Sequence, residues 1–155
     1  MMKASFTAAL LSAIACAGRY KIGVFSDIHL QPNYLPDRPA SQYCVKSTSG
    51  DKIAAEDAYF GRLHCDPPYK LVETAFQKMN ADHDQIDFIL VPGDLIGHSI
   101  SLDLSEISEM TELEQEKRYM QLLQTHKSIA SLFEEYFPDT PVLPTFGNND
   151  AKYHY

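Results

Sequence analysis

Three short apolar runs along the chain each lead into a polar cluster. They are YKIGVFSDIH (Tyr20–His29), DFILVPGD (Asp87–Asp94) and PVLPTFGNND (Pro141–Asp150). Their apolar, β-branched and aromatic residues follow one another without clear alternation, which is typical of strands buried on both faces of a parallel sheet. We therefore expect three buried strands, each ending where its polar cluster begins.

Helical periodicity fills the intervals between these runs. Residues Pro68–Asn80 place apolar side chains at helical spacing, and the longer segment Thr111–Phe137 carries an apolar stripe opposite charged residues. The order strand, long loop, helix, strand, loop, helix, strand predicts an α/β fold with a mostly parallel sheet and right-handed crossovers. The first loop, from His29 to Pro67, is unusually long, and loops of that length are functional or disordered.

The first residues have the pattern of a secretory signal peptide. The stretch MMKASFTAALLSAIACAG offers an early positive charge at Lys3, an apolar run and a small-residue site that ends at Ala17. The alternative is a buried N-terminal helix, and the run is too short for a membrane span, which needs about 20 residues. We expect a signal peptide over residues 1–17, a mature domain over residues 18–155, and secretion or delivery to a lysosomal or vacuolar lumen.

Charge and cysteine content narrow the function further. The formal net charge of −8 argues against a nucleic-acid-binding protein, which needs clustered Lys and Arg. Removal of residues 1–17 would also remove Cys16 and leave Cys44 and Cys65, an even pair in an oxidising compartment. These two residues either form a disulfide or are two independent buried thiols.

Residues that can bind metal ions follow each predicted strand. Asp27 and His29 are two positions apart, so in an extended segment their side chains point the same way. Asp94 follows a glycine after the second run, and Asn148 and Asp150 follow a glycine after the third. Parallel sheets bind ligands beyond the carboxyl ends of their strands, and a set of carboxylate, imidazole and amide without thiolate suits Zn, Fe or Mn better than Ca. Each cluster alone is also typical of an ordinary strand-ending turn.

These clusters, taken in order, resemble a known family. D-x-H, then G-D, then G-N-[H/N]-[D/E] is the opening half of the calcineurin-like metallophosphoesterase signature. The segments DIHLQPNY, CDPPYKLVETAFQKM and PGDLIGHS are similar to stretches of the acid sphingomyelinase-like phosphodiesterases and their endopolyphosphatase relatives. The resemblance runs from Tyr20 to Asp150. It implies the N-terminal half of a four-layer α/β/β/α sandwich with a mostly parallel sheet.

By position, the resemblance implies a two-metal centre. Asp27 and His29 would bind the first ion, Asp94 would bridge the two ions, and Asn148 would bind the second. The ions would be zinc, with iron or manganese as alternatives. A hydroxide activated by both ions would attack the phosphorus of a phosphodiester, as in sphingomyelinase-like hydrolysis. His98 matches a histidine that assists the leaving group.

The sequence departs from the family pattern at three places. Gln31 stands where the family has Asp, and Asn149 where most members have a general-acid histidine. An amide donates a hydrogen bond but delivers no proton, so of the two catalytic candidates, His98 and Asn149, His98 would carry the proton transfer. The family's later histidines have no counterpart after Asn148. We therefore expect the C-terminal half of the domain to be missing and the chain alone to turn over little.

Two functions fit this sequence. The first is a metal-dependent phosphodiesterase whose substrate is a lipid head group, a nucleotide or polyphosphate. The alternative is a non-catalytic secreted binding module derived from the same half-fold. Among the remaining polar residues, His126 falls on the apolar side of the long helix and is expected to be a core or edge histidine.

Overall fold

The computed structural model describes residues 19–38, 44–45, 58–82, 85–100 and 104–153. Its elements, in chain order, are β1 (Ile22–Ser26), the 3-10 helix η2 (Ala58–Phe60), α1 (Tyr69–Asp82), β2 (Phe88–Gly93), α2 (Leu104–Ile107), α3 (Glu112–Tyr136) and β3 (Val142–Pro144). The predicted signal peptide lies outside the described residues and stays a prediction.

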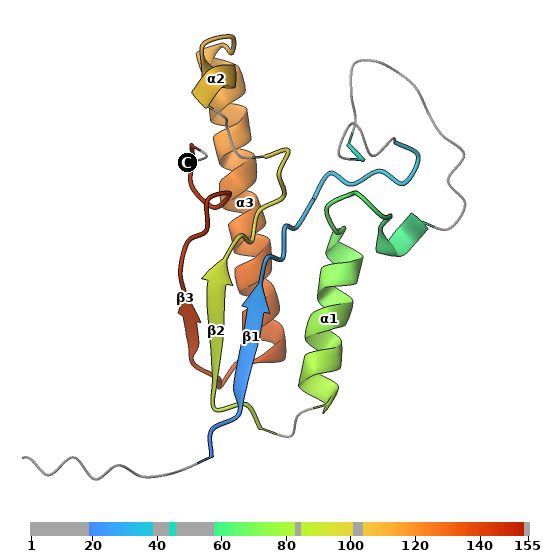
Figure 1. The fold of residues 1–155 in the computed structure, drawn as a ribbon, viewed down its shortest axis with the longest axis vertical. Helices are drawn as coiled ribbons and strands as arrows, with labels where there is room; N and C mark the ends of the chain where they lie inside the picture. The colour runs from blue at the N-terminus through green and yellow to red at the C-terminus, as the bar shows by residue number, and fades with distance from the viewer. Residues whose placement is uncertain (1–18, 39–43, 46–57, 83–84, 101–103, 154–155) are drawn as a thin grey trace, which may run out of the picture.

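One sheet organises these elements. Its strand order is β1-β2-β3, and both pairs of neighbours are parallel. The two long helices, α1 and α3, link these strands and pack against the sheet (Figure 1). The predicted α/β fold with a mostly parallel sheet is thus confirmed. The two predicted helices are also confirmed, whereas the short helices η2 and α2 were not predicted.

An aromatic cluster forms the centre of the core between the helices and the sheet. The ring of Phe76, on α1, lies 4.3 Å from that of Phe25 on β1 and 4.8 Å from that of Phe133 on α3. Phe76 is fully buried, and aliphatic side chains of β2 such as Ile89 and Val91 complete the layer. The apolar faces of both helices and the buried face of the sheet pack together in this cluster, which holds the sheet against both helices.

The opposite face of the sheet is largely exposed. Along β1, burial alternates between residues, so that Gly23 and Phe25 are buried while Ile22 and Val24 are each about half exposed. Leu143 on β3 is also half exposed. The expectation of burial on both faces is therefore wrong for β1 among the described residues, because α1 and α3 lie on the same face of the sheet.

The long helix α3 begins at a capping box. Thr111 is the N-cap residue, and its side chain accepts a hydrogen bond from the backbone N–H of Glu114, whose carboxylate in turn accepts one from Thr111. Two hydrogen bonds lower the pKa of the Glu114 carboxyl. The larger effect comes from the Thr111 side chain, and the smaller one from the Thr111 backbone N–H. This cap fixes the start of α3.

None of the helices in the described part of the chain combines the length and the apolar character that a membrane span requires.

Truncation of the central aromatic side chain should strongly destabilise the fold. Phe76→Ala removes a fully buried ring, and such changes lower the free energy of unfolding by about 3–5 kcal/mol. Leu113→Ala, at an exposed position of α3, is the control and should change it by no more than about 0.5 kcal/mol. Urea unfolding followed by circular dichroism measures both, and equal effects would contradict this core assignment.

Candidate metal centre

Three side chains that can bind a metal ion converge beyond the carboxyl ends of β1 and β2. They are Asp27 and His29, in the loop after β1, and Asp94, in the loop after β2. One ligand atom from each lies within 4.8 Å of the others. The Asp27 side chain is 67% exposed, whereas His29 is mostly buried, so the cluster opens to solvent on the side of Asp27. The predicted convergence of these three residues agrees with the structure.

The backbone brings these residues together in an unexpected way. Asp27, His29 and Asp94 have φ values of 53°, 44° and 56°, in the left-handed region that residues other than glycine rarely adopt. The extended segment expected around Asp27 and His29 is therefore wrong. Their backbone N–H groups donate to the carbonyls of Gly93 and Asp94, and this pairing holds the bend. Such conformations gather at functional sites, where the surrounding structure enforces them.

The imidazole of His29 is oriented by the backbone. Its Nδ1 lies 3.1 Å from the carbonyl oxygen of Ile96, and since a carbonyl only accepts, Nδ1 carries the hydrogen of this bond. The other nitrogen, Nε2, lies 4.0 Å from a carboxylate oxygen of Asp27. A histidine that donates one N–H to a backbone carbonyl keeps its other nitrogen available to a metal ion.

Asp150 serves the backbone and is not directed at the cluster. It is buried, and its carboxylate accepts hydrogen bonds from the backbone N–H groups of Asp94, Leu95, Ile96 and Gly147, at 2.7, 2.7, 3.2 and 2.8 Å. The earlier suggestion that Asp150 offers an oxygen ligand is thus not supported by its geometry. Instead, this carboxylate joins the loop after β3 to the loop after β2.

The two glycines of these loops approach each other closely. A side chain on Gly93, whose φ is 117°, would collide with the backbone of Gly147, and one on Gly147 would collide with Asp94. Because neither position has a side chain, the turn that carries Asn148 lies directly beside Asp94. Asn148 itself is half-buried.

Asn149 lies deeper in the same turn. Its side chain is buried, and its backbone N–H donates to the Asp94 carboxylate at 3.1 Å. Asn149 thus contacts the cluster through its backbone. His126, on α3, places Nε2 3.0 Å from the carbonyl oxygen of Asp150, so it is an edge histidine that supports this turn, as predicted.

A second group adjoins the first through His29. The ring of His98 stacks on that of His29, with centroids 4.3 Å apart, and its Nδ1 lies 2.9 Å from the carboxylate of Asp66. His29, Asp66 and His98 also have ligand atoms within 4.8 Å of one another. Asp66 was not among the site residues predicted from the sequence. The only available signal was its place in the family-like segment CDPPYKLVETAFQKM.

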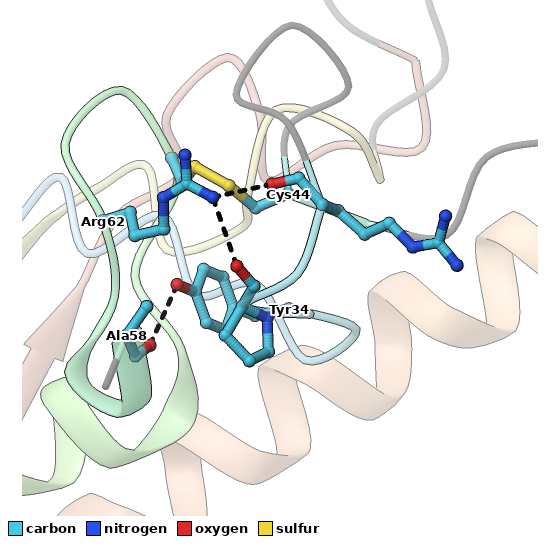
Figure 2. Close-up of a disulfide and its surroundings, with 7 residues drawn as sticks. Tyr34, Cys44, Ala58 and Arg62 are labelled. Atoms are coloured by element: carbon cyan, nitrogen blue, oxygen red, sulfur yellow. Dashed lines mark hydrogen bonds between the residues drawn. A yellow bond between two sulfur atoms is a disulfide. The ribbon is translucent and has the colours of Figure 1, made fainter. Parts of the chain in front are cut away.

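The loop before Asp66 is closed by a disulfide. Cys44 and Cys65 are bonded, with Cα atoms 5.8 Å apart, so the disulfide alternative is confirmed. Beside it, the hydroxyl of Tyr34 donates to the carbonyl of Ala58, and Arg62 donates to two carbonyls of the loop (Figure 2). These bonds fix the segment that leads into Asp66.

Gln31 is buried at the start of the loop that follows β1. Its side-chain amide donates to the hydroxyl of Ser99 and accepts from the backbone N–H of Asn33, and its own N–H donates to the carbonyl of Pro67. Gln31 therefore links three loop segments by hydrogen bonds.

A large hollow on the described surface lies away from this cluster. It has a volume of about 720 Å³ and follows the groove between α3 and β3, where its lining is mainly apolar and includes Leu123, Phe133 and Val142. It reaches Asp150 but holds no converging set of ligands. The candidate metal ligands among the described residues lie instead at the strand ends.

The side chains at the strand ends fit divalent metal ions. Two carboxylates and one imidazole, with an amide oxygen in the adjoining turn, form a hard-to-borderline donor set of the type that binds Zn, Fe or Mn. The exposed side of Asp27 gives access to an ion from solvent. The fixed ring of His29 supplies one preformed ligand direction.

Comparison with known proteins gives a consistent result. The sequence profile of the calcineurin-like phosphoesterases matches residues 20–155. The chain is 29% identical over 125 residues to acid sphingomyelinase-like phosphodiesterase 3b of Mus musculus, 30% identical over 126 residues to sphingomyelin phosphodiesterase A of Dictyostelium discoideum, and 26% identical over 125 residues to a cyclic GMP-AMP phosphodiesterase of Bos taurus. Each match covers 81% of this chain but only 24%, 19% and 24% of the relative. The chain thus spans a quarter or less of the length of these relatives.

Loss of the Asp150 charge should loosen both the fold and the cluster. Asp150→Asn replaces a buried acceptor of four N–H groups by an amide that also donates, and breaking such a charge-assisted network costs about 3 kcal/mol or more. Asp82→Asn, which removes an exposed ion pair with Lys78, is the control and should cost at most about 1 kcal/mol. Thermal unfolding compares the two variants, and a wild-type melting temperature for Asp150→Asn would refute the role assigned to this carboxylate.

Proposed function

This chain belongs to the calcineurin-like phosphoesterase family, and we propose that it acts in the metal-dependent hydrolysis of phosphodiesters. The observation that carries the proposal is the convergence of Asp27, His29 and Asp94 at the strand ends. The names of the similar proteins support a phosphodiester as the substrate class, since they include phosphodiesterases of sphingomyelin and of cyclic GMP-AMP.

Each residue of the cluster has a proposed part in this activity. Asp27 and His29 would hold a first ion, Asp94 would be a ligand to both ions, and Asn148, in the turn after β3, would hold the second. The ions would be zinc, with iron or manganese as alternatives. When bound, such ions lower the pKa of a water molecule and offset the charge on phosphoryl oxygens.

The remaining side chains act on the substrate or support the loops. His98, which is half exposed and stacked on His29, offers a hydrogen bond to an oxygen of the phosphodiester. Asn149 is the second catalytic candidate of the sequence. Its burial and its backbone bond to Asp94 favour a supporting role, in which it holds the turn against that carboxylate.

The compartment follows from the same features. The bond between Cys44 and Cys65 is typical of proteins in oxidising environments, and the apolar N-terminal pattern agrees with export. We therefore propose that the chain is secreted or reaches a lysosomal or vacuolar lumen, where it meets a lipid head group, a nucleotide or polyphosphate.

A second candidate function is a non-catalytic binding module. The observation that favours it is Asn149, because a buried amide in place of the family's histidine cannot donate a proton. In addition, the described residues bring together fewer ligands than the four that surround each ion in a closed site. For the chain by itself we expect metal binding with slow turnover.

Metal binding tests the carrying observation. Isothermal titration of the chain with zinc or manganese should show binding that Asp27→Asn and Asp94→Asn each weaken by about 10-fold or more, because loss of a residue that only supports a ligand already costs about 10–100-fold. Asp139→Asn is the control, since Asp139 precedes β3 and lies at the opposite end of that strand. Equal affinities for all four proteins would contradict the site.

Hydrolysis separates the two functions. The monodisperse chain is incubated with zinc or manganese and bis-p-nitrophenyl phosphate, and release of p-nitrophenol is compared with that from Asp94→Asn. Metal-dependent release that disappears in the variant supports the enzyme and contradicts the binding module. Metal binding without any release favours the module.

A further inference from the structure

Asp66 uses both of its carboxylate oxygens on one residue. One oxygen accepts the backbone N–H of His98 at 2.7 Å, and the other lies 2.9 Å from Nδ1 of the His98 ring. The Asp66 side chain is only 11% exposed, whereas that of His98 is 50% exposed. A half-exposed ring would normally sample several orientations, and this two-point contact restricts it to one.

The surroundings are shaped to permit this contact. A side chain on Gly97 would lie 3.1 Å from the carboxylate of Asp66 and 3.0 Å from the carbonyl of Leu30, so glycine at this position lets the carboxylate approach the following N–H. The residues on either side of Asp66 are anchored too. Cys65 is bonded to Cys44, and the carbonyl of Pro67 accepts from Gln31.

The ring of His29 stacks on one face of the His98 ring. The two rings are 4.3 Å apart and nearly parallel, with an interplanar angle of 13°. His29 is itself held by the carbonyl of Ile96. The hydrogen bonds with Asp66 therefore fix the orientation of the His98 ring. Stacking on His29, a residue of the candidate metal site, fixes the position of the ring plane.

We propose that Asp66 is a positioning residue for His98. A carboxylate only accepts, so Nδ1 of His98 carries the hydrogen of their bond, and the neutral ring keeps its lone pair on Nε2. Asp66 thereby sets which nitrogen faces away from the loop, beside His29 and the cluster. This inference rests on the proposed function, in which Nε2, in the protonated ring that Asp66 stabilises, donates a hydrogen bond to an oxygen of the phosphodiester. A carboxylate that orients a histidine in this way is a recurring device of hydrolytic sites.

An alternative use of the same atoms is a metal site made of His29, Asp66 and His98, whose ligand atoms are close enough. Both oxygens of Asp66 are already engaged with His98, which favours the pairing over ligation. The two uses make different predictions for zinc affinity. As a positioning residue, Asp66 can be replaced without loss of zinc affinity.

Nitrogen NMR of the imidazole rings tests this inference without metal or turnover. The chain, labelled with ¹⁵N-histidine, is measured near pH 8.5, about two units above the usual histidine pKa, and the signal of His98 is assigned by its loss in His98→Gln. The wild-type ring should have a protonated Nδ1 and an unprotonated Nε2. Asp66→Ala should move the hydrogen to Nε2, the form that an unrestrained histidine prefers, whereas the control Asp139→Ala should not.

Several results would overturn the proposal. A wild-type ring with its hydrogen on Nε2 contradicts it directly, whether or not Asp66→Ala folds. An unchanged tautomer in a folded Asp66→Ala protein, with wild-type amide spectra, also contradicts it. Loss of zinc affinity in Asp66→Ala as large as in Asp27→Asn would instead make Asp66 a ligand. The proposed function fails separately, if the expected tautomer is found but the chain neither binds metal nor hydrolyses a phosphodiester.

Discussion

The arrangement of the candidate site depends on one buried carboxylate. Asp150 accepts four backbone N–H groups, three from the segment Asp94–Ile96 and one from Gly147. Hydrogen bonds to a charged acceptor are about twice as strong as neutral ones, and here they close the gap between the loops after β2 and β3. His126 of α3 then contacts the carbonyl of Asp150, so the helix layer also stabilises this junction. The hydrogen bond from the backbone N–H of Asn149 to the Asp94 carboxylate adds a second link between the same two loops.

A second constraint is the conformation of the loops themselves. The parallel register carries the pairing of β1 and β2 past the ends of the strands, because the N–H groups of Asp27 and His29 still bond to carbonyls of the β2 loop. This pairing enforces left-handed φ values at the three proposed ligands. The close approach of Gly93 and Gly147 brings in the third loop. Backbone geometry thus positions the proposed ligands, and hydrogen bonds to the His29 ring and the Asp94 carboxylate then orient their side chains.

Much of this arrangement was predictable from the sequence, for identifiable reasons. Apolar runs and helical periodicity predicted β1, β2, α1 and α3, because burial of an element against the core requires apolar residues at regular positions in its sequence. Gly and Asp at the ends of the runs indicated the candidate ligands, whose side chains lie close together in the structure. The sequence pattern could not show that Asp150 accepts backbone hydrogen bonds, because an aspartate at this position can equally be a buried acceptor or a metal ligand. Asp66 escaped notice because its partner, His98, is remote in the chain and its Pro-rich surroundings have no periodicity.

The proposed metal site lies in the strand-end loops, among Asp27, His29 and Asp94. X-ray diffraction at the zinc absorption edge, from crystals of the chain grown with zinc, tests it most directly, because the anomalous signal locates the ion independently of any assumed ligand. We expect the strongest anomalous peak to lie among these three side chains. A strongest peak at another place, such as between Asp66 and His98 or on the exposed His64, would contradict it.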